Sequence, residues 1–317
     1  MTHPFLSPTP PETPGALLAR ARDLPVPRVA LVNAGSATAL AGLREMAAAG
    51  LATPILIGDP AKIRDAATQI DWDISDLPLI DAPREAASVA AAELARDSGA
   101  DAIMKGQVHT STFLKGLLPS RAGLRAPGAR CGHVFHITLP GDDRPLFLTD
   151  AALNVAPDVE TRKACLAHAV RLAQLVGIER PRAAMLGATE DPIASIPNTL
   201  ESQDIADWAK DALPQADVAG PIAMDLALSA EAARIKGYEN PVAGAADIMV
   251  APAITTGNVL FKTLAFGMGA CAGGVVMGAK VPFLLTSRAQ KTPARLASAA
   301  LGMIVAADAA RTAPAAQ

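Results

Sequence analysis

Short aliphatic runs alternate with amphipathic segments over the first hundred residues of the chain. The runs have the length and content of strands buried on both faces, and they predict strands at residues 27–32, 53–58 and 101–104. Apolar residues at helical spacing predict helices between them, at residues 37–49, 61–68 and 84–96. Residues 70–83, with four aspartates and two prolines, are expected to be irregular surface. This serial order is typical of an α/β fold.

The same alternation resumes after residues 118–132, whose glycine, proline and arginine content indicates a domain boundary. Two strands joined by a GDDR turn are predicted at residues 133–140 and 145–150. The remaining pattern predicts helices at residues 158–176, 199–210, 225–235 and 292–307, and strands at residues 182–186 and 217–219. The last strand and helix are expected to return to the first domain, which makes the second domain an insertion.

Residues 242–288 contain three apolar runs with small or polar ends, DIMVAP, AGGVVMG and VPFLLTS. Such runs are typical of buried strands whose carboxyl ends open onto a ligand cleft. Between the first two, TTGNVLFKTL predicts a helix start, where Thr256 would cap the first turn and Gly257 would let a ligand approach the free amides. A helix N-terminus of this kind attracts anions. The last run delivers Ser287 and Arg288, side by side, where a strand passes into a helix.

A second polar group follows the predicted strand 101–104. Lys105 lies at the carboxyl end of that strand, and His109 and Thr110 precede a helix that runs through residue 118. Because open parallel sheets bind ligands at the carboxyl ends of their strands, this group predicts another wall of the cleft. An ordinary loop with a helix cap is the alternative interpretation. With Asn258 and Lys262 from the later stretch, the group suits an anionic substrate.

The composition narrows the class of protein. Half of the residues are hydrophobic but only 3% are aromatic, which favours an α/β enzyme and gives no sign of base stacking. The net charge of −3 arises from charges mixed along the chain, so neither nucleic acid nor a membrane is an expected partner. The longer apolar stretches fall well short of the roughly 20 residues that span a bilayer.

The cysteines and the N-terminus predict the compartment. Cys131, Cys165 and Cys271 are isolated and are expected to be buried small hydrophobic residues in a reducing environment. Residues 1–14 are rich in proline, lack the apolar core of a signal peptide and are expected to form a disordered tail. Together these features predict a cytoplasmic protein.

Other patterns do not support a site. Cys131, His133 and His136 would fall on both faces of a strand without a second ligand pair, which argues against a metal. GMGACAG stands after a helix and before a strand, the wrong order for a phosphate-binding turn. The sequence contains no Walker motif and no GxSxG nucleophile motif.

Five stretches make a family resemblance specific. They are IMKGQVHTSTFL, GHVFHI with RPLFLTDAALNVAPDVETR, GPIAMDLALS, VAGAADIMVAP with TTGNVLFKTL, and VPFLLTSR. With these motifs in this order, from about residue 101 to residue 301, the chain resembles the phosphate acetyltransferase and phosphate butyryltransferase family. The TDAALNVAPDVETR segment is closer to the butyryltransferase branch.

The resemblance implies an α/β protein with two domains, a three-layer sandwich of the isocitrate/isopropylmalate dehydrogenase-like fold. Domain I would comprise residues 15–128 and 280–317, and domain II residues 129–279, after the tail 1–14. The cleft would bind coenzyme A and phosphate, and the family is usually homodimeric. Coenzyme A is a substrate here, and neither a metal nor a redox cofactor is implied.

The family also implies roles for single residues. Its serine-arginine pair, matched by Ser287 and Arg288, bonds the coenzyme A thiol and engages phosphate and the acyl carbonyl. Its phosphate-binding arginine is matched by Lys115, which keeps the charge but loses bidentate geometry. Its carboxylate base, a few residues after the pair, is replaced by Gln290 and Ala294. Further candidate substrate-binding residues, at the ends of predicted strands in the motifs, are Asp150 and Asp225.

The sequence thus predicts a phosphate acyltransferase for a short acyl group, butyryl or acetyl with a slight preference for butyryl. The alternative is a non-catalytic or weakly active acyl-CoA-binding member of the same family, suggested by Gln290 and Lys115. A dehydrogenase on the related fold would need metal-binding aspartates and a nucleotide loop, neither of which the sequence contains.

Overall fold

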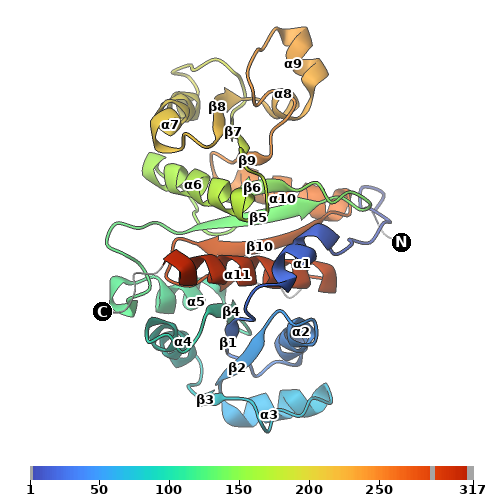
Figure 1. Ribbon diagram of the computed structural model, residues 1–317, viewed down its shortest axis with the longest axis vertical. Coiled ribbons are helices and arrows are strands. Elements are labelled where there is room, and N and C mark those ends of the chain that lie inside the picture. Colours follow the sequence, from blue (N-terminus) through green and yellow to red (C-terminus); the bar gives the residue numbers. More distant parts are fainter. Residues whose placement is uncertain (1–2, 286–289, 313–317) are drawn as a thin grey trace. The chain divides into compact units, whose positions relative to one another are not determined.

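The structure, a computed structural model, describes residues 3–285 and 290–312 of the chain (Figure 1). The chain forms two compact units. Unit I comprises Pro11–Arg130 and Gly273–Gln317, and unit II comprises Met1–Pro10 and Cys131–Ala272. Each unit combines strands with helices, so the α/β class predicted from the sequence is confirmed.

The strands of unit I lie in the order β3, β2, β1, β4, β11, β10. They are β1 (Arg28–Val32), β2 (Thr53–Gly58), β3 (Leu79–Asp81), β4 (Ala102–Lys105), β10 (Cys271–Met277) and β11 (Phe283–Leu284). Strand β10 belongs to unit I from Gly273 onwards. The pairs from β3 to β11 are parallel, and β10 is antiparallel to β11. Val32 stands beside Ile57 on one side and Lys105 on the other, so β1, β2 and β4 end at the same edge. The loops that leave this edge are therefore neighbours.

The helices of unit I cover these strands. They are α1 (Gly15–Arg22), α2 (Ala37–Ala48), α3 (Pro60–Gln69), α4 (Ala86–Arg96), α5 (Thr110–Leu117) and α11 (Thr292–Thr312). Helices α1 and α2 pack on α11, and α5 packs on α4. By length and composition α11 could cross a membrane, but 56% of its apolar window is buried inside the protein. It also contacts β4 and β11, which is the behaviour of a core helix.

The strands of unit II lie in the order β5, β6, β9, β7, β8. They are β5 (Gly132–Thr138), β6 (Leu146–Thr149), β7 (Arg182–Leu186), β8 (Asp217–Ile222) and β9 (Ile248–Val250). Strands β5 and β6 form the predicted antiparallel pair, and the other neighbours are parallel. Thr149 stands beside Val250, so β6 and β9 end together and their following loops meet.

The helices of unit II follow the predicted order, except that one predicted helix, 225–235, is two helices. They are α6 (Val159–Leu175), α7 (Pro197–Ala212), α8 (Met224–Leu228), α9 (Ala230–Lys236) and α10 (Ile254–Lys262), which passes into a π-helical turn (Thr263–Gly267). Aspartate side chains cap two helix starts, α3 in unit I and α6 in unit II. Asp59 accepts hydrogen bonds from Ala61 N and Lys62 N, and Asp158 accepts one from Thr161 N.

Two elements of unit I were not predicted. Residues 70–83 were expected to be irregular, but β3 lies among them because Leu79 and Ile80 pair with Leu56 and Ile57 of β2. A long-range pairing here overrides a local composition that favours loops. Helix α1 begins directly after the proline-rich tail and buries Leu17 and Ala21.

Two predictions about helix starts in unit II are wrong. The expected helix 225–235 is two helices, because Ser229 adopts an extended backbone and accepts a hydrogen bond from Ala232 N to begin α9. Thr256 does not cap α10. That helix begins at Ile254 after Ala253, so Thr256 lies inside its first turn with an exposed side chain.

The N-terminal residues 3–10 contain no helix or strand. They run beside the end of the π-helical turn, where Ser7 N donates to Phe266 O at 2.8 Å. Phe5 is 82% exposed, so this segment adds little to the core of unit II.

Candidate active site

The Ser287–Arg288 pair lies outside the described residues, and its described flanks are β11 and Gln290. Gln290 donates from Nε2 to Ala294 O at 3.2 Å and to Ser298 Oγ at 3.4 Å. At the position where the resemblance implies a carboxylate base, this amide therefore joins the first turn of α11. Ala294 itself is buried within that helix.

An ion pair between Arg295 of α11 and Glu45 of α2 lies next to Gln290. Arg295 bonds both oxygens of Glu45 on α2, the shorter contact being 2.7 Å, and donates to the carbonyl of Gln290. The Arg295 side chain crosses Gly42, where a Cβ would lie 3.2 Å from its Cδ. The Glu45 carboxylate is thus linked through Arg295 to the backbone of Gln290.

The loop between β4 and α5 brings three predicted residues together in unit I. Lys105 ends β4 and donates from Nζ to Val108 O at 3.3 Å. His109 is the N-cap residue of α5 and Thr110 is its first residue, but the His109 side chain makes no cap bond. Lys115 lies in the last turn of α5 and is exposed.

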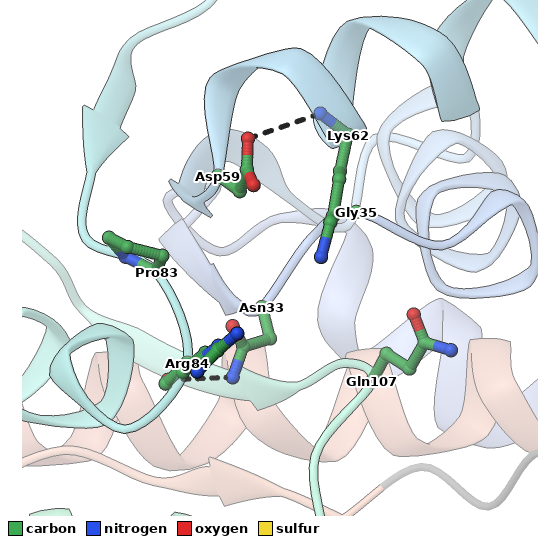
Figure 2. A pocket seen from close by; sticks show the side chains of 7 residues that line it. All are labelled: Asn33, Gly35, Asp59, Lys62, Pro83, Arg84 and Gln107. Carbon is green, nitrogen blue, oxygen red and sulfur yellow. Dashed lines mark hydrogen bonds between the residues drawn. The ribbon is translucent and has the colours of Figure 1, made fainter.

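A cavity of about 480 Å³ adjoins this loop (Figure 2). It lies at the carboxyl ends of β1, β2, β3 and β4, and its lining residues are Asn33, Gly35, Asp59, Lys62, Pro83, Arg84 and Gln107. Gln107 belongs to the β4–α5 loop, two residues from both Lys105 and His109. The strand-end rule that singles out Lys105 also applies to Asn33 and Asp59, which directly follow predicted strands but were not predicted as site residues.

Asp150 organises the corresponding edge of unit II. Its buried carboxylate accepts hydrogen bonds from His133 N, Ala152 N and Leu153 N at 2.9–3.1 Å, and from Asn154 Nδ2 at 2.7 Å. Charge-assisted bonds of this kind are strong. They hold the loop that connects β6 to α6.

The first turn of α10 packs directly on that loop. A Cβ at Gly257 would lie 2.5 Å from Asp150 O, and Asn258 donates from Nδ2 to Ala151 O at 3.1 Å. Three predicted residues, Asp150, Gly257 and Asn258, are thus brought together. The close approach that the sequence predicted at Gly257 is made by the protein's own backbone.

The other candidates of unit II lie at exposed positions. Lys262 is the last residue of α10. Asp225 lies in the first turn of α8 and pairs with Lys236 of α9, with Oδ2 3.1 Å from Nζ. The hydrogen bond from Lys236 lowers the pKa of the Asp225 carboxyl. Asp225 therefore joins α8 to α9.

Two histidines, His133 and His136, and all three cysteines are buried. Burial lowers the pKa of His133 and of His136 to about 4 and raises the pKa of the Cys165 thiol to about 12. All three cysteines are buried and none forms a disulfide, which confirms their prediction as small hydrophobic residues. Within residues 3–285 and 290–312, no group of three His, Cys, Asp or Glu side chains is arranged to hold a metal ion.

Comparisons with known proteins agree with the predicted family. Residues 80–303 match the sequence profile of the family described as phosphate acetyl/butaryl transferase. The chain is 40% identical to a phosphate acetyltransferase of Rhizobium meliloti, over 85% of this chain and 86% of that protein. It is 35% identical to a phosphate butyryltransferase of Clostridium acetobutylicum, over 92% of this chain and 97% of that protein.

A solved structure agrees as well. The crystal structure of a branched-chain phosphotransacylase from Enterococcus faecalis superposes with a TM-score of 0.76 and 27% sequence identity. The superposition covers 88% of this chain and 99% of that one.

Proposed function

This chain belongs to the phosphate acetyl/butaryl transferase family, and from this membership we propose that it transfers a short acyl group reversibly between coenzyme A and inorganic phosphate. The reaction is acyl-CoA + phosphate = acyl phosphate + CoA. The observation that carries it is the 40% identity with a phosphate acetyltransferase over most of both chains. Because a phosphate butyryltransferase also aligns, at 35% identity over 92% of the chain, the acyl group is acetyl or butyryl.

Ser287 and Arg288 are the proposed catalytic residues. In the forward direction phosphate is already an anionic nucleophile, and it attacks the thioester carbonyl of acyl-CoA. The thiolate of coenzyme A leaves with the electron pair of the broken carbon–sulfur bond, and Ser287 donates a hydrogen bond to that sulfur. Arg288 binds phosphate and stabilises the negative charge that develops on the carbonyl oxygen.

The reverse direction needs a thiolate without the carboxylate base of the family. Free thiols have a pKa of about 8.5, so a few per cent is ionised at neutral pH, and the Arg288 cation would increase that fraction. General-base catalysis contributes roughly 10²- to 10⁴-fold in typical enzymes. Gln290 in place of a carboxylate therefore predicts slower acyl-CoA synthesis, with the reaction still catalysed.

Of the remaining candidate residues, some are proposed to bind the substrates and others to stabilise the loops around the site. Lys105, His109, Thr110 and Lys115 belong to one strand-end loop and its helix, which suits the binding of phosphate. Lys262 contributes a cation to coenzyme A binding. Asp150 supports the loop on which Gly257 and Asn258 pack.

The proposal also covers the specific fold family, the assembly and the location of the protein. We infer an isocitrate/isopropylmalate dehydrogenase-like fold with a three-layer sandwich, a homodimeric assembly and a cytoplasmic location, with no metal or redox cofactor. The isolated, buried cysteines support the reducing compartment.

Turnover with a series of acyl phosphates tests the function. Purified protein is mixed with coenzyme A and acetyl, propionyl or butyryl phosphate, and acyl-CoA formation is followed by loss of free thiol. We expect turnover with at least one of these substrates, and a larger loss in Arg288→Ala than in Gln290→Ala. Absence of turnover with all three would refute the proposal.

A non-catalytic acyl-CoA-binding role is the second candidate, and Gln290 favours it. An amide has no basic group at neutral pH, so Gln290 cannot substitute for a carboxylate base, and its Nε2 donates to Ala294 O and Ser298 Oγ. Calorimetry that detects coenzyme A binding, together with no phosphate-dependent release of thiol from acyl-CoA, would select this candidate.

A further inference from the structure

One long stretch of the chain carries positive charge without any acidic residue. Residues 102–141 contain five lysines and arginines and no aspartate or glutamate, whereas the whole chain has 28 basic and 31 acidic residues. Three of the five, Arg121, Arg125 and Arg130, stand between α5 and β5. We call residues 118–131 the α5–β5 loop. Because a surface lined by one sign of charge concentrates ligands of the opposite sign, this loop is a candidate anion site.

The α5–β5 loop lies at the amino ends of strands of unit I, at the edge opposite the proposed substrate loops. A Cβ on Gly123 would lie 2.8 Å from Cδ of Arg96, the last residue of α4, which leads into β4. Leu124 O accepts a hydrogen bond from Lys280 N, just before β11, and β11 is parallel to β4. The loop is thus fixed beside the starts of β4 and β11, away from the loops that follow β1, β2 and β4.

The loop forms a cavity of about 290 Å³. The cavity is lined by two arginines, Arg125 and Arg130, by Ser120 and by the small residues 126–129. Among these lining residues none is acidic. Small-molecule sites have volumes of roughly 300–1,000 Å³, so this cavity suits a ligand of few heavy atoms.

Arg125 is oriented by the backbone of the loop. Its Nε donates to Leu118 O and its Nη1 to Ala129 O, both at 2.9 Å. Both acceptors are neutral carbonyls, and within residues 3–285 and 290–312 no carboxylate pairs with Arg125 and its Nη2 has no acceptor. A guanidinium that is fixed in place and retains an unused donor is well suited to bind the oxygens of a phosphate group.

We propose that the cavity of the α5–β5 loop binds a phosphate group, as inorganic phosphate or on a small phosphate ester. Arg125 supplies the charged donor and Ser120 supplies a hydroxyl donor. A phosphate group presents at least three acceptor oxygens in different directions, so it can accept from both side chains at once. This site goes beyond the proposed function, because it lies at the opposite edge of unit I from the loop assigned to the substrates.

Titration with inorganic phosphate tests the site directly. Protein with isotope-labelled glycine is titrated with sodium phosphate, and with sodium chloride at equal ionic strength, while NMR follows the amide signal of Gly128. We expect a saturable shift with phosphate and none with chloride. A parallel titration with glycerol 3-phosphate shows whether the free or the esterified phosphate group binds more tightly. Saturation by neither compound, or equal shifts with phosphate and chloride, would overturn the proposal.

Two variants change the cavity in different ways. Arg125→Gln removes the charged donor, whereas Ser120→Glu keeps Arg125 with its backbone bonds and adds a negative charge beside it. Both should weaken phosphate binding at least about tenfold, the usual effect of losing one charged hydrogen bond to a ligand. Arg121→Gln is the matched control, because Arg121 is an exposed arginine of the same loop that does not line the cavity. Wild-type affinity in Ser120→Glu, or an equal loss in Arg121→Gln, would contradict the site.

Acyl transfer separates this site from the proposed active site. Ser120→Glu should leave kcat/KM for acyl phosphate and for coenzyme A unchanged. A fall in kcat/KM as large as the loss of phosphate affinity would assign the loop to the active site and overturn the proposal. The NMR titration requires no turnover, so the response of Gly128 decides the site even where the wild type turns over no acyl phosphate and the proposed function fails.

Discussion

Strand ends carry polar residues in both units, but the two sets are arranged in opposite ways. In unit II the Asp150 carboxylate is buried and accepts bonds from His133 N, Ala152 N, Leu153 N and Asn154. In unit I the cations of Lys62 and Arg84 face an open cavity without ion-pair partners among the described residues. A group whose bonding capacity is already used stabilises its loop, whereas a group with unused capacity is available to a ligand.

Removal of the Asp150 carboxylate should have the largest effect on stability. Asp150→Ala leaves several buried donors without an acceptor, each of which costs about 1–3 kcal/mol, so we expect the free energy of unfolding to fall by about 3–5 kcal/mol. Asp150→Asn keeps the shape and should lose less. Urea denaturation measures both changes.

Asp225→Asn is the control for this prediction. Asp225 is also a carboxylate after a strand of unit II, but it is exposed and its charge pairs with Lys236. Its loss should change the free energy of unfolding by less than about 1 kcal/mol. Equal effects of the two substitutions would contradict the distinction between a saturated and an exposed carboxylate.

Acid should weaken unit II through its buried histidines. Burial lowers the pKa of His136 to about 4 in the folded state, against about 6.5 in the unfolded chain. Between these two values the unfolded chain binds a proton that the folded protein does not, so stability is lost as the pH falls from about 6.5 to about 4. At pH 5 the loss for this one group is about 2 kcal/mol.

A variant without this group tests the assignment. In His136→Phe the fall in unfolding free energy between pH 7.5 and pH 5 should be smaller than in the wild type by about 2 kcal/mol. Urea titrations at the two pH values give the difference. The same pH dependence in both proteins would show that His136 does not contribute to it.

Arg295 combines features of both groups, since it is well bonded and contacts Gln290, which follows the proposed catalytic pair in the sequence. Arg295→Met keeps the stem over Gly42 but removes the bonds to Glu45 and to the Gln290 carbonyl. We expect a loss of about 1 kcal/mol in stability. Because Ser287 and Arg288 stand three and two residues before Gln290 in the sequence, we also expect kcat to fall about tenfold, since small misplacements of catalytic groups slow reactions strongly.

Comparison of kcat and KM with a control separates these effects. Arg311→Gln removes an exposed arginine from the same helix, together with its pair to Asp308, and should change neither quantity. A stability loss in Arg295→Met with an unchanged kcat would limit Arg295 to a structural role.

Sequence patterns predicted most elements because local periodicity decides them. Strand β2 and strand β7 match the predicted ranges 53–58 and 182–186, and the serial order of strands and helices is confirmed. The resemblance to the acyltransferase family is confirmed as well. The failures have a non-local cause. Strand β3 forms through its pairing with β2. Helix α10 begins at Ile254, two residues before Thr256, which was expected to cap it.

Only part of the candidate site could be predicted, because sequence patterns reveal strand ends but not contacts between distant residues. The β4–α5 loop and the group of Asp150, Gly257 and Asn258 follow from the rule on strand ends, but the role of Asp150 as an acceptor for its own loop depends on neighbours such as His133. The cavity residue Arg84 follows a strand that the sequence did not reveal. Lys62 reaches the cavity from the first turn of α3, so no strand-end pattern marks it.

The smallest effect on stability is expected from substitutions at the cavity of unit I, in contrast to the large effect expected at Asp150 in unit II. Lys62 and Arg84 are exposed and have no ion-pair partner in the described chain, so Lys62→Gln/Arg84→Gln breaks no ion pair there. The free energy of unfolding should change by less than about 0.5 kcal/mol, the usual range for surface substitutions. Urea denaturation of the free protein measures this value. A large destabilisation of the free variant would show that these side chains hold the loops together, as Asp150 does, and the contrast between the two strand ends would disappear.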